Sequence, residues 1–299
     1  MSISKTHLWL SLVSLIWGLN FSIMKVGVLT LGPLSFAFLR FALSGLLMFV
    51  VLFLVEKNPW ISWRDFPYFL FLGVLGFGAY QPLWSYGLKL SLASHSALIL
   101  SISPVVVSLV TFLRKEEWIR GINLVGILVS FLGVVFLVRP QGGENFSSSV
   151  IWGDLLTVIA AVCWGLYSYF GKKMVLRYSP LKSGTWSILL GLLVMFPVCF
   201  RDFFRIEARN FSLTFIMVLL YGTVLSSLVS YLLWMRGIKE IGAARTSAYQ
   251  YLTQVVGVIG AWIFFREPLR LQLFVGMLLV SCGLWLSQRR PSLDKDGER

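Results

Sequence analysis

The chain is short of charge, and of acidic residues above all. Only 13 of its 299 residues are Asp or Glu, and charged residues of both signs make up 13% of it, about half the share found in a soluble domain. Hydrophobic residues reach 57% and the mean hydropathy is +0.81. So few polar residues exclude an ordinary soluble protein and predict a protein embedded in a lipid bilayer.

Cysteine and histidine are also scarce. The three cysteines, Cys163, Cys199 and Cys282, lie inside apolar segments, which predicts neither a disulfide framework nor a metal cluster. The two histidines, His7 and His95, stand near the ends of such segments, and we expect His95 to be a satisfied surface side chain. The sequence also offers no paired carboxylates and no nucleophile with its base. We therefore predict no metal, no cofactor and no enzymatic activity.

The 26 Lys and Arg residues give the chain a net charge of +13. Such a charge would suit a nucleic-acid partner if it formed one basic face on a soluble fold. Here the basic residues punctuate apolar runs, as they do in membrane proteins, so we exclude nucleic acid. Most of them fall in the connections on the side that holds the amino terminus. By the positive-inside rule, both termini are predicted to be cytoplasmic.

Ten apolar segments are long enough to span a membrane, which takes about 20 residues of helix. The predicted fold is therefore an all-α, polytopic membrane protein with ten transmembrane helices. The segments cover residues 7–28, 33–55, 66–88, 93–113, 121–138, 151–175, 181–200, 211–235, 243–265 and 271–288.

The first segment carries a stretch that returns in the sixth. Trp17-Gly18 is followed by Lys25, and Trp164-Gly165 is followed by Lys172, a shift of 147 positions. Near the ends of the two halves the shift becomes 150. Matches at that shift are Trp84 with Trp234, Gly87-Leu88-Lys89 with Gly237-Ile238-Lys239, Glu117 with Glu267, Gly126 with Gly276 and Gly133 with Gly283. So many matches in register predict an internal duplication.

The duplication divides the chain into two repeats. We expect a first repeat over residues 1–139, a linker over 140–150, a second repeat over 151–288 and a cytoplasmic tail over 289–299. Each repeat holds five predicted helices, an odd number, so the second copy would be inverted in the membrane. Inverted repeats are typical of secondary transporters, which bind substrate between the copies near the midplane. The pattern therefore favours transport by alternating access.

Several motifs together resemble one known family. They are Trp17-Gly18-Leu19-Asn20-Phe21 with Lys25, Pro33 with Arg40, Ser103-Pro104-Val105, and Glu117. The set is similar to the EamA family of the drug/metabolite transporter superfamily, over nearly the whole chain. This resemblance implies a ten-helix permease of the bacterial plasma (inner) membrane, most often an exporter of amino acids or other small metabolites. The second repeat departs from the pattern, because Ser187 replaces Arg40 and Gln254 replaces Pro104.

Polar and aromatic side chains at mid-membrane depth make up the predicted substrate site. A polar group in lipid is costly, so such residues are expected to face protein or water. Aromatic residues with hydroxyls and amides suit a neutral or zwitterionic solute better than a phosphate, which would want several basic side chains. The predicted substrate-binding residues are Trp17, Asn20, Tyr80, Gln81, Trp84, Ser101, Trp164, Tyr167, Tyr231, Trp234, Tyr251 and Gln254.

Simple helix packing is the alternative role for these residues. Trp17 and Trp164 lie too deep to be interfacial anchors, so they either line a cavity or pack between helices. Tyr80, Gln81 and Trp84 share one side of a helix, which either lines a cavity or joins a neighbouring helix by hydrogen bonds. The recurrence of polar groups on the equivalent side of the second repeat favours the cavity.

Arg40 lies seven residues past Pro33, roughly 10 Å into its helix. Its charge either snorkels to the membrane surface, makes structural hydrogen bonds or binds a substrate carboxylate, and the sequence leaves these three open.

Inversion of the repeats would bring Lys25 near Glu267 at one membrane face and Lys172 near Glu117 at the other. We predict these two pairs as candidate gates. The glycines and Ser130 in segments 121–138 and 271–288 form small-residue stripes, which predict close packing between those two helices.

Together these features predict an inner-membrane transporter of small organic metabolites, an exporter of neutral or zwitterionic solutes such as amino acids. Its partners would be the substrate and the lipid bilayer, and it would act as a monomer or homodimer. Without a carboxylate at mid-membrane, we expect movement down a gradient or exchange, with no carboxylate-based proton step. The alternatives are a non-transporting membrane scaffold or receptor, and a lipid-linked-sugar flippase on the same fold.

Overall fold

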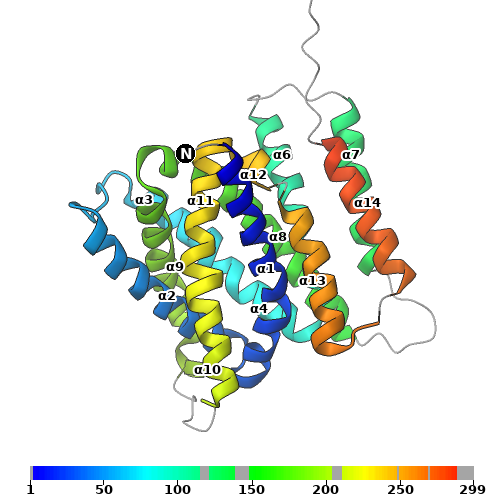
Figure 1. The fold of residues 1–299 in the computed structure, drawn as a ribbon, viewed down its shortest axis with the longest axis horizontal. Helices are drawn as coiled ribbons and strands as arrows, with labels where there is room; N and C mark the ends of the chain where they lie inside the picture. Colours follow the sequence, from blue (N-terminus) through cyan, green and yellow to red (C-terminus); the bar gives the residue numbers. More distant parts are fainter. Residues whose placement is uncertain are drawn as a thin grey trace, which may run out of the picture.

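Helices make up all the regular structure of the described part of the chain (Figure 1). The computed structural model describes residues 3–114, 121–138, 148–203, 211–247, 249–268 and 270–287. Within these ranges no β-strand forms, as the all-α prediction requires. Glu117, the predicted tail and most of the predicted linker lie outside the described residues.

The helices coincide closely with the predicted segments. In the first half they are α1 (Ile3–Leu31), α2 (Pro33–Val55), α3 (Phe66–Gly73), α4 (Tyr80–Leu90), α5 (Ala93–Ile99), α6 (Ser103–Leu113) and α7 (Gly121–Val138). In the second half they are α8 (Ser148–Arg177), α9 (Pro180–Phe203), α10 (Leu213–Leu220), α11 (Ser230–Ile241), α12 (Ala243–Ser247), α13 (Gln250–Phe265) and α14 (Leu271–Ser287). α8 begins at Ser148, so the last residues of the predicted linker are helical.

Eight helical stretches of the described residues are long and apolar enough to cross a membrane. Their outward surfaces are apolar: Leu46 is 61% exposed, Leu54 is 77% exposed and Leu278 is 63% exposed. Contiguous exposed apolar surface on this scale is rare on soluble monomers and suits contact with lipid. The described chain is therefore a polytopic membrane protein.

Three of the spanning stretches contain an irregular turn. π-helical turns join α3 to α4 at Val74–Ala79 and α10 to α11 at Tyr221–Val229, and a 3₁₀ turn joins α5 to α6 at Leu100–Ile102. In the second π turn, Ser227 Oγ donates to the Gly222 carbonyl at 2.7 Å. Such turns are uncommon and are frequent at functional sites.

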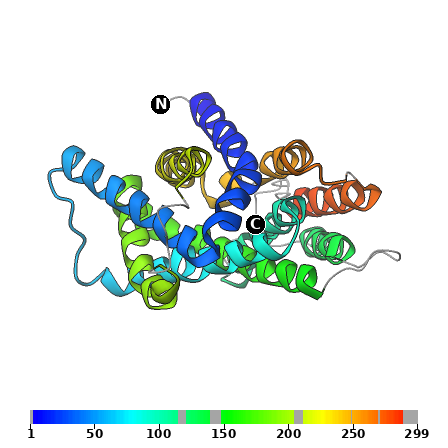
Figure 2. The ribbon, with the colours of Figure 1, turned by 90° about the horizontal axis from the view of Figure 1, so that it is seen from below.

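Helices of the first half pack mainly on helices of the second half. α1 lies against α13, α4 against α8, α2 against α9 and α7 against α14. α2 and α9 occupy one end of the bundle and α7 and α14 the other (Figure 2). The centre is left to α1, α4, α8, α11 and α13 (Figure 1).

The α7–α14 contact is made by small residues. A side chain added to Gly283 would lie 2.5 Å from the Gly126 carbonyl oxygen, and one added to Gly133 would lie 2.8 Å from Leu279 Cβ. Ser130 Oγ also donates to the Val280 carbonyl at 3.2 Å. These contacts confirm the predicted packing between segments 121–138 and 271–288.

A close crossing of α3 and α9 gives the first prediction. A Cβ on Gly73 of α3 would lie 2.6 Å from the Gly191 backbone nitrogen of α9. Gly73→Ala should therefore destabilise the protein, because overpacking costs about 1–3 kcal/mol and exceeds the gain of about 1 kcal/mol in helix propensity. Thermal unfolding of the purified protein measures the effect.

Gly171→Ala is the matched control, since its new Cβ would meet only Met235 Cε at 3.9 Å. We expect that variant to unfold at or above the wild-type temperature. A Gly73→Ala protein as stable as the Gly171→Ala protein would contradict the close α3–α9 contact.

Candidate functional site

A cavity lies at the centre of the bundle, where helices from both halves meet. The cavity has a volume of about 40 Å³, enough for about three waters. Its wall combines indole, phenol, amide, hydroxyl and guanidinium groups. The lining residues are Trp17, Asn20, Phe21, Arg40, Tyr80, Gln81, Trp84, Leu100, Trp164, Ser226, Tyr231, Gln250 and Thr253. We call this space the central pocket.

Aromatic rings form one part of the wall. Trp17 of α1 meets Trp164 of α8 edge to face, with ring centroids 5.5 Å apart. Trp17 also contacts Trp234 at 4.9 Å, and Tyr80 contacts Trp164 at 5.4 Å. The Trp17 Nε1 donates to the Ser226 carbonyl at 2.9 Å, so the partly buried indole is satisfied and its position is fixed.

Arg40, Gln81 and Tyr231 form the polar part of the wall. Arg40 Nη2 donates to Gln81 Oε1 at 2.8 Å, and Gln81 Nε2 donates to the Tyr231 hydroxyl at 3.2 Å. All three side chains are buried, and Arg40 is only 3% exposed. Of the three roles that the sequence left open for Arg40, snorkelling to the surface is therefore wrong.

The structure brings together seven of the twelve predicted substrate-binding residues. Two more are buried beside the pocket without lining it, because Tyr167 stacks on Trp164 at 5.3 Å and Trp234 contacts Trp17. Gln254 is buried on α13 away from the pocket wall. The side chains of Ser101 and Tyr251 lie outside the described part of the structure. The seven that line the pocket are Trp17, Asn20, Tyr80, Gln81, Trp84, Trp164 and Tyr231.

Five lining residues were not predicted. Phe21 and Leu100 carry no polar group, so mid-membrane depth alone does not distinguish them from lipid-facing residues. Ser226 lies in the π turn after α10. This wider turn changes which side of the helix faces the pocket, so α-helical spacing does not predict Ser226. Gln250 and Thr253 are three residues apart and so lie on the same side of α13. This polar pair is visible in the sequence next to Gln254, which was predicted instead.

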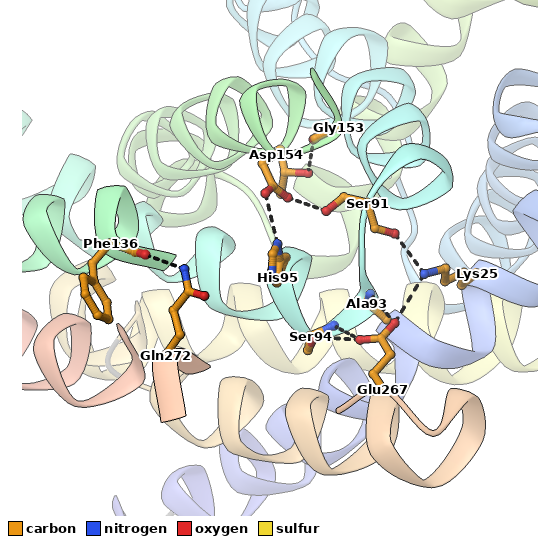
Figure 3. Close-up of polar contacts among 11 residues, drawn as sticks. Lys25, Ser91, Ala93, Ser94, His95, Phe136, Gly153, Asp154, Glu267 and Gln272 are labelled. Atoms are coloured by element: carbon orange, nitrogen blue, oxygen red, sulfur yellow. Dashed lines mark hydrogen bonds and ion pairs between the residues drawn. The ribbon is translucent and has the colours of Figure 1, made fainter. Parts of the chain in front are cut away.

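A second group of polar side chains lies where α1, α4, α5, α8 and α13 end or begin (Figure 3). We call it the helix-end network. Its members are Lys25, Ser91, Ser94, His95, Asp154 and Glu267.

Glu267 holds one side of the helix-end network. It accepts from the backbone nitrogens of Ala93 at 2.9 Å and Ser94 at 3.0 Å, the first residues of α5, and from Ser94 Oγ at 2.6 Å. Lys25 Nζ lies 3.4 Å from Glu267 and donates to the Ser91 carbonyl at 2.9 Å. A carboxylate at this place caps α5 and complements the positive end of its dipole.

His95 and Asp154 hold the other side, and the surface role expected for His95 is wrong. His95 is 6% exposed, and its Nδ1 lies 3.0 Å from Asp154 Oδ2. Ser91 Oγ donates to Asp154 Oδ1, which joins this pair to Lys25 (Figure 3). The sequence placed both residues near helix ends but gave no sign that the ends are packed together.

The other predicted gate pair, Lys172 with Glu117, falls partly outside the described residues. Lys172 is exposed on α8, and Glu117 lies outside the described residues. Within the described ranges, no three His, Cys, Asp or Glu side chains gather closely enough to hold a metal ion.

The ionisation of Glu267 leads to the second prediction. Burial alone would raise the pKa of this carboxyl, but hydrogen bonds from Ser94, the charge of Lys25 and the Ala93 amide outweigh burial and lower the pKa. A lowered folded-state pKa contributes stability above the ordinary Glu value of about 4.3. That stability is lost as pH falls through the folded-state pKa.

Glu267→Gln should therefore destabilise the protein at pH 7, by roughly 1.5–3 kcal/mol, the contribution of hydrogen bonds to a charged group. The difference from wild type should shrink as pH falls below about 4.3. Thermal unfolding between pH 7 and pH 3.5 checks this. A difference that stays constant or widens toward acid pH is incompatible with an ionised cap.

Comparison with known proteins identifies the family. The model of the EamA-like transporter family matches residues 4–139 and 151–288. An uncharacterized transporter of Archaeoglobus fulgidus is 28% identical over 286 residues, which cover 96% of this chain and 99% of the relative. A probable amino-acid metabolite efflux pump of Salmonella typhimurium is 27% identical, over 92% of each chain.

One crystal structure has the same fold. It superposes with a TM-score of 0.65 at 18% sequence identity, over 96% of this chain and 99% of the other. The family and these relatives are transporters, a class of proteins that move solutes and are not enzymes. With two matched segments that cover most of its length, the chain belongs to the EamA-like transporter family.

Proposed function

We propose that this protein exports small neutral or zwitterionic organic solutes, such as amino acids, and binds them in the central pocket. The observation that carries the proposal is the composition of the pocket wall, which joins aromatic and hydrogen-bonding groups from both halves of the chain. Ligand sites are typically apolar pockets with a few placed polar groups. The efflux-pump name of the Salmonella typhimurium relative agrees with an amino-acid solute.

Contacts between repeat-equivalent residues support the inverted-repeat arrangement. When two repeats are related by a two-fold axis, residues close to the axis contact the residues at the equivalent positions of the other repeat. Trp17 contacts Trp164, its counterpart at the 147-residue shift. Gln81 bonds to Tyr231 at the 150-residue shift, and Ser130 bonds to Val280 at the same shift. These contacts support a substrate site at the pseudo-symmetry axis, which is where inverted-repeat transporters bind their substrates.

Alternating access follows from this symmetry. If the two halves can exchange conformations, the same fold opens to either side of the membrane around a fixed site. The present pocket has room for about three waters, so an amino acid would enter only after the lining helices move apart. We take the structure to be a narrow state of the cycle.

The Lys25–Glu267 pair is the proposed gate on one face. Lys25 lies two turns beyond Trp17 on α1, so a movement of α1 that widens the pocket would also displace the pair. Exposed pairs contribute about 0–1 kcal/mol. This pair is largely buried, at 12% and 6% exposure, but Lys25 and Glu267 each have other partners. It would therefore bias the conformational balance without locking it.

The aromatic wall gives the third prediction. Trp164→Ala and Trp84→Ala should each reduce solute flux several-fold or change its selectivity, because each removes a ring from the pocket wall. The measurement is counterflow of radiolabelled phenylalanine and leucine in proteoliposomes with matched amounts of protein. Folding is checked by thermal unfolding.

Leu46→Ala is the control, because Leu46 is exposed on the outer side of α2 and should leave flux unchanged. Normal flux and selectivity in both tryptophan variants would remove the pocket from the transport path. If wild-type protein moves no tested solute, the non-transporting scaffold gains support over the transporter.

Membrane topology is the fourth prediction. We propose ten spans in a bacterial inner membrane: the eight long apolar stretches described above, together with α7 and α14. Both termini would lie in the cytoplasm. α1 begins and α14 ends at the same end of the bundle (Figure 1), and most basic residues fall on that side. Reporter fusions at each terminus should both report the cytoplasm. A periplasmic carboxyl terminus would overturn the arrangement.

A further inference from the structure

We propose that Arg40 anchors a carboxylate of the transported solute, so that the pocket selects zwitterions such as amino acids over amines and other solutes without a carboxylate. This inference rests on the proposed function of the central pocket and names the chemical class of its substrate. It is carried by a buried cation on the pocket wall whose hydrogen-bond donors are mostly unused.

The guanidinium of Arg40 has more donors than partners. An arginine side chain carries five N–H groups. Among the described residues, one bonds to Gln81 Oε1 at 2.8 Å and one points at Met24 Sδ at 3.2 Å. Sulfur is a weak acceptor, and Arg40 Nε is buried without a partner. A buried donor left unpaired costs free energy, so this side chain is poised for a further acceptor.

No counter-charge accompanies Arg40 in the described part of the chain. Its guanidinium makes no ion pair there. The buried carboxylates of the described residues are engaged elsewhere: Asp154 and Glu267 in the helix-end network and Asp65 with Arg177. An uncompensated cation inside a membrane protein is costly and typically marks a substrate pathway. The missing negative charge is supplied in this proposal by the solute.

The surroundings of Arg40 stabilise the cation without satisfying its free donors. Its Cζ lies over two aromatic rings, 4.2 Å from the Phe41 centroid and 5.8 Å from the Trp84 centroid. Cation–π attraction offsets part of the cost of a buried charge. The remaining N–H groups still need an oxygen acceptor, which a carboxylate would supply.

The position of the guanidinium is fixed in advance. A Cβ on Gly222 would lie 2.7 Å from Arg40 Cδ, so the absence of a side chain there makes room for the arginine. Gln81 is itself held by the Tyr231 hydroxyl at 3.2 Å. A donor group that is positioned before binding loses less entropy when the ligand arrives.

The same wall holds complementary groups for the rest of an amino acid. Trp84 Nε1 is a second buried donor without a partner among the described residues, and Asn20 Oδ1 is a buried acceptor without one. Both side chains line the pocket with Arg40. Donors suit a carboxylate and the acceptor suits an ammonium group, which favours a zwitterion over a simple anion.

The test compares matched pairs of solutes that differ only at the carboxyl group. The probes are phenylalanine and phenylalaninamide, leucine and leucinamide, and 3-phenylpropionate and 3-phenylpropanamide. Binding to the full-length protein in nanodiscs is measured by tryptophan fluorescence, since Trp17, Trp84 and Trp164 line the pocket. Ligand-induced thermal stabilisation provides a second reading.

We expect each carboxylate to bind at least about ten-fold tighter than its amide, because charge-assisted bonds are roughly twice as strong as neutral ones. Arg40→Met should reduce that ratio to near one, and Arg40→Lys should keep part of it. Lys89→Met is the control, since Lys89 is an exposed cation at the end of α4, and the ratio should not change. If Arg40→Met does not fold, Arg40→Lys carries the comparison.

The outcomes separate this inference from the proposed function. If amides bind as tightly as carboxylates, or if the ratio is unchanged in the Arg40 variants, the carboxylate anchor is wrong. In that case a loss of binding in Trp164→Ala would still support the pocket as a solute site. If no probe of any pair binds, the proposed function and the inference fail together.

Discussion

The edge-to-face contact of Trp17 with Trp164 is the point on which the rest of the structure depends. The two indoles come from α1 and α8, the first helices of the two halves, and they meet 5.5 Å apart beside the central pocket. Rings of this size bury large areas and resist displacement. The positions of α1 and α8 relative to one another therefore determine the pocket wall, and through Lys25 on α1 and Asp154 on α8 they also determine the helix-end network.

That network solves a problem specific to a membrane protein. The first N–H groups of α5 have no partners within their own helix, and lipid offers none. Glu267 supplies acceptors from beyond α13 in the other half of the chain. The cap is thus also a contact between the two halves. If a conformational change separates α13 from α5, either Glu267 stays with α5 or the N–H groups of Ala93 and Ser94 become exposed to water.

The helices could be predicted from sequence because the membrane sets their length and because few polar residues interrupt them. Trp17, Asn20 and Gln81 were found for the same reason, since any polar group at that depth needs a partner. Gln250 and Thr253 were passed over for Gln254, because packing sets the rotation of α13 about its axis and so decides which of its polar residues face the pocket. The His95–Asp154 pair was missed because 59 residues separate its members and only the tertiary fold brings them together.

Irregular backbone is concentrated around the central pocket. Tyr80 follows one π turn, Ser226 lies within the other, and Leu100 begins the 3₁₀ turn between α5 and α6. Non-helical backbone at membrane depth is tolerated only where it lines a cavity or is buried in protein. These turns also form weaker ladders than an α-helix, so bending there costs less than bending elsewhere. The residues that line the pocket and the places where the helices can bend therefore coincide. A molecule bound in the pocket would thus act directly on its shape.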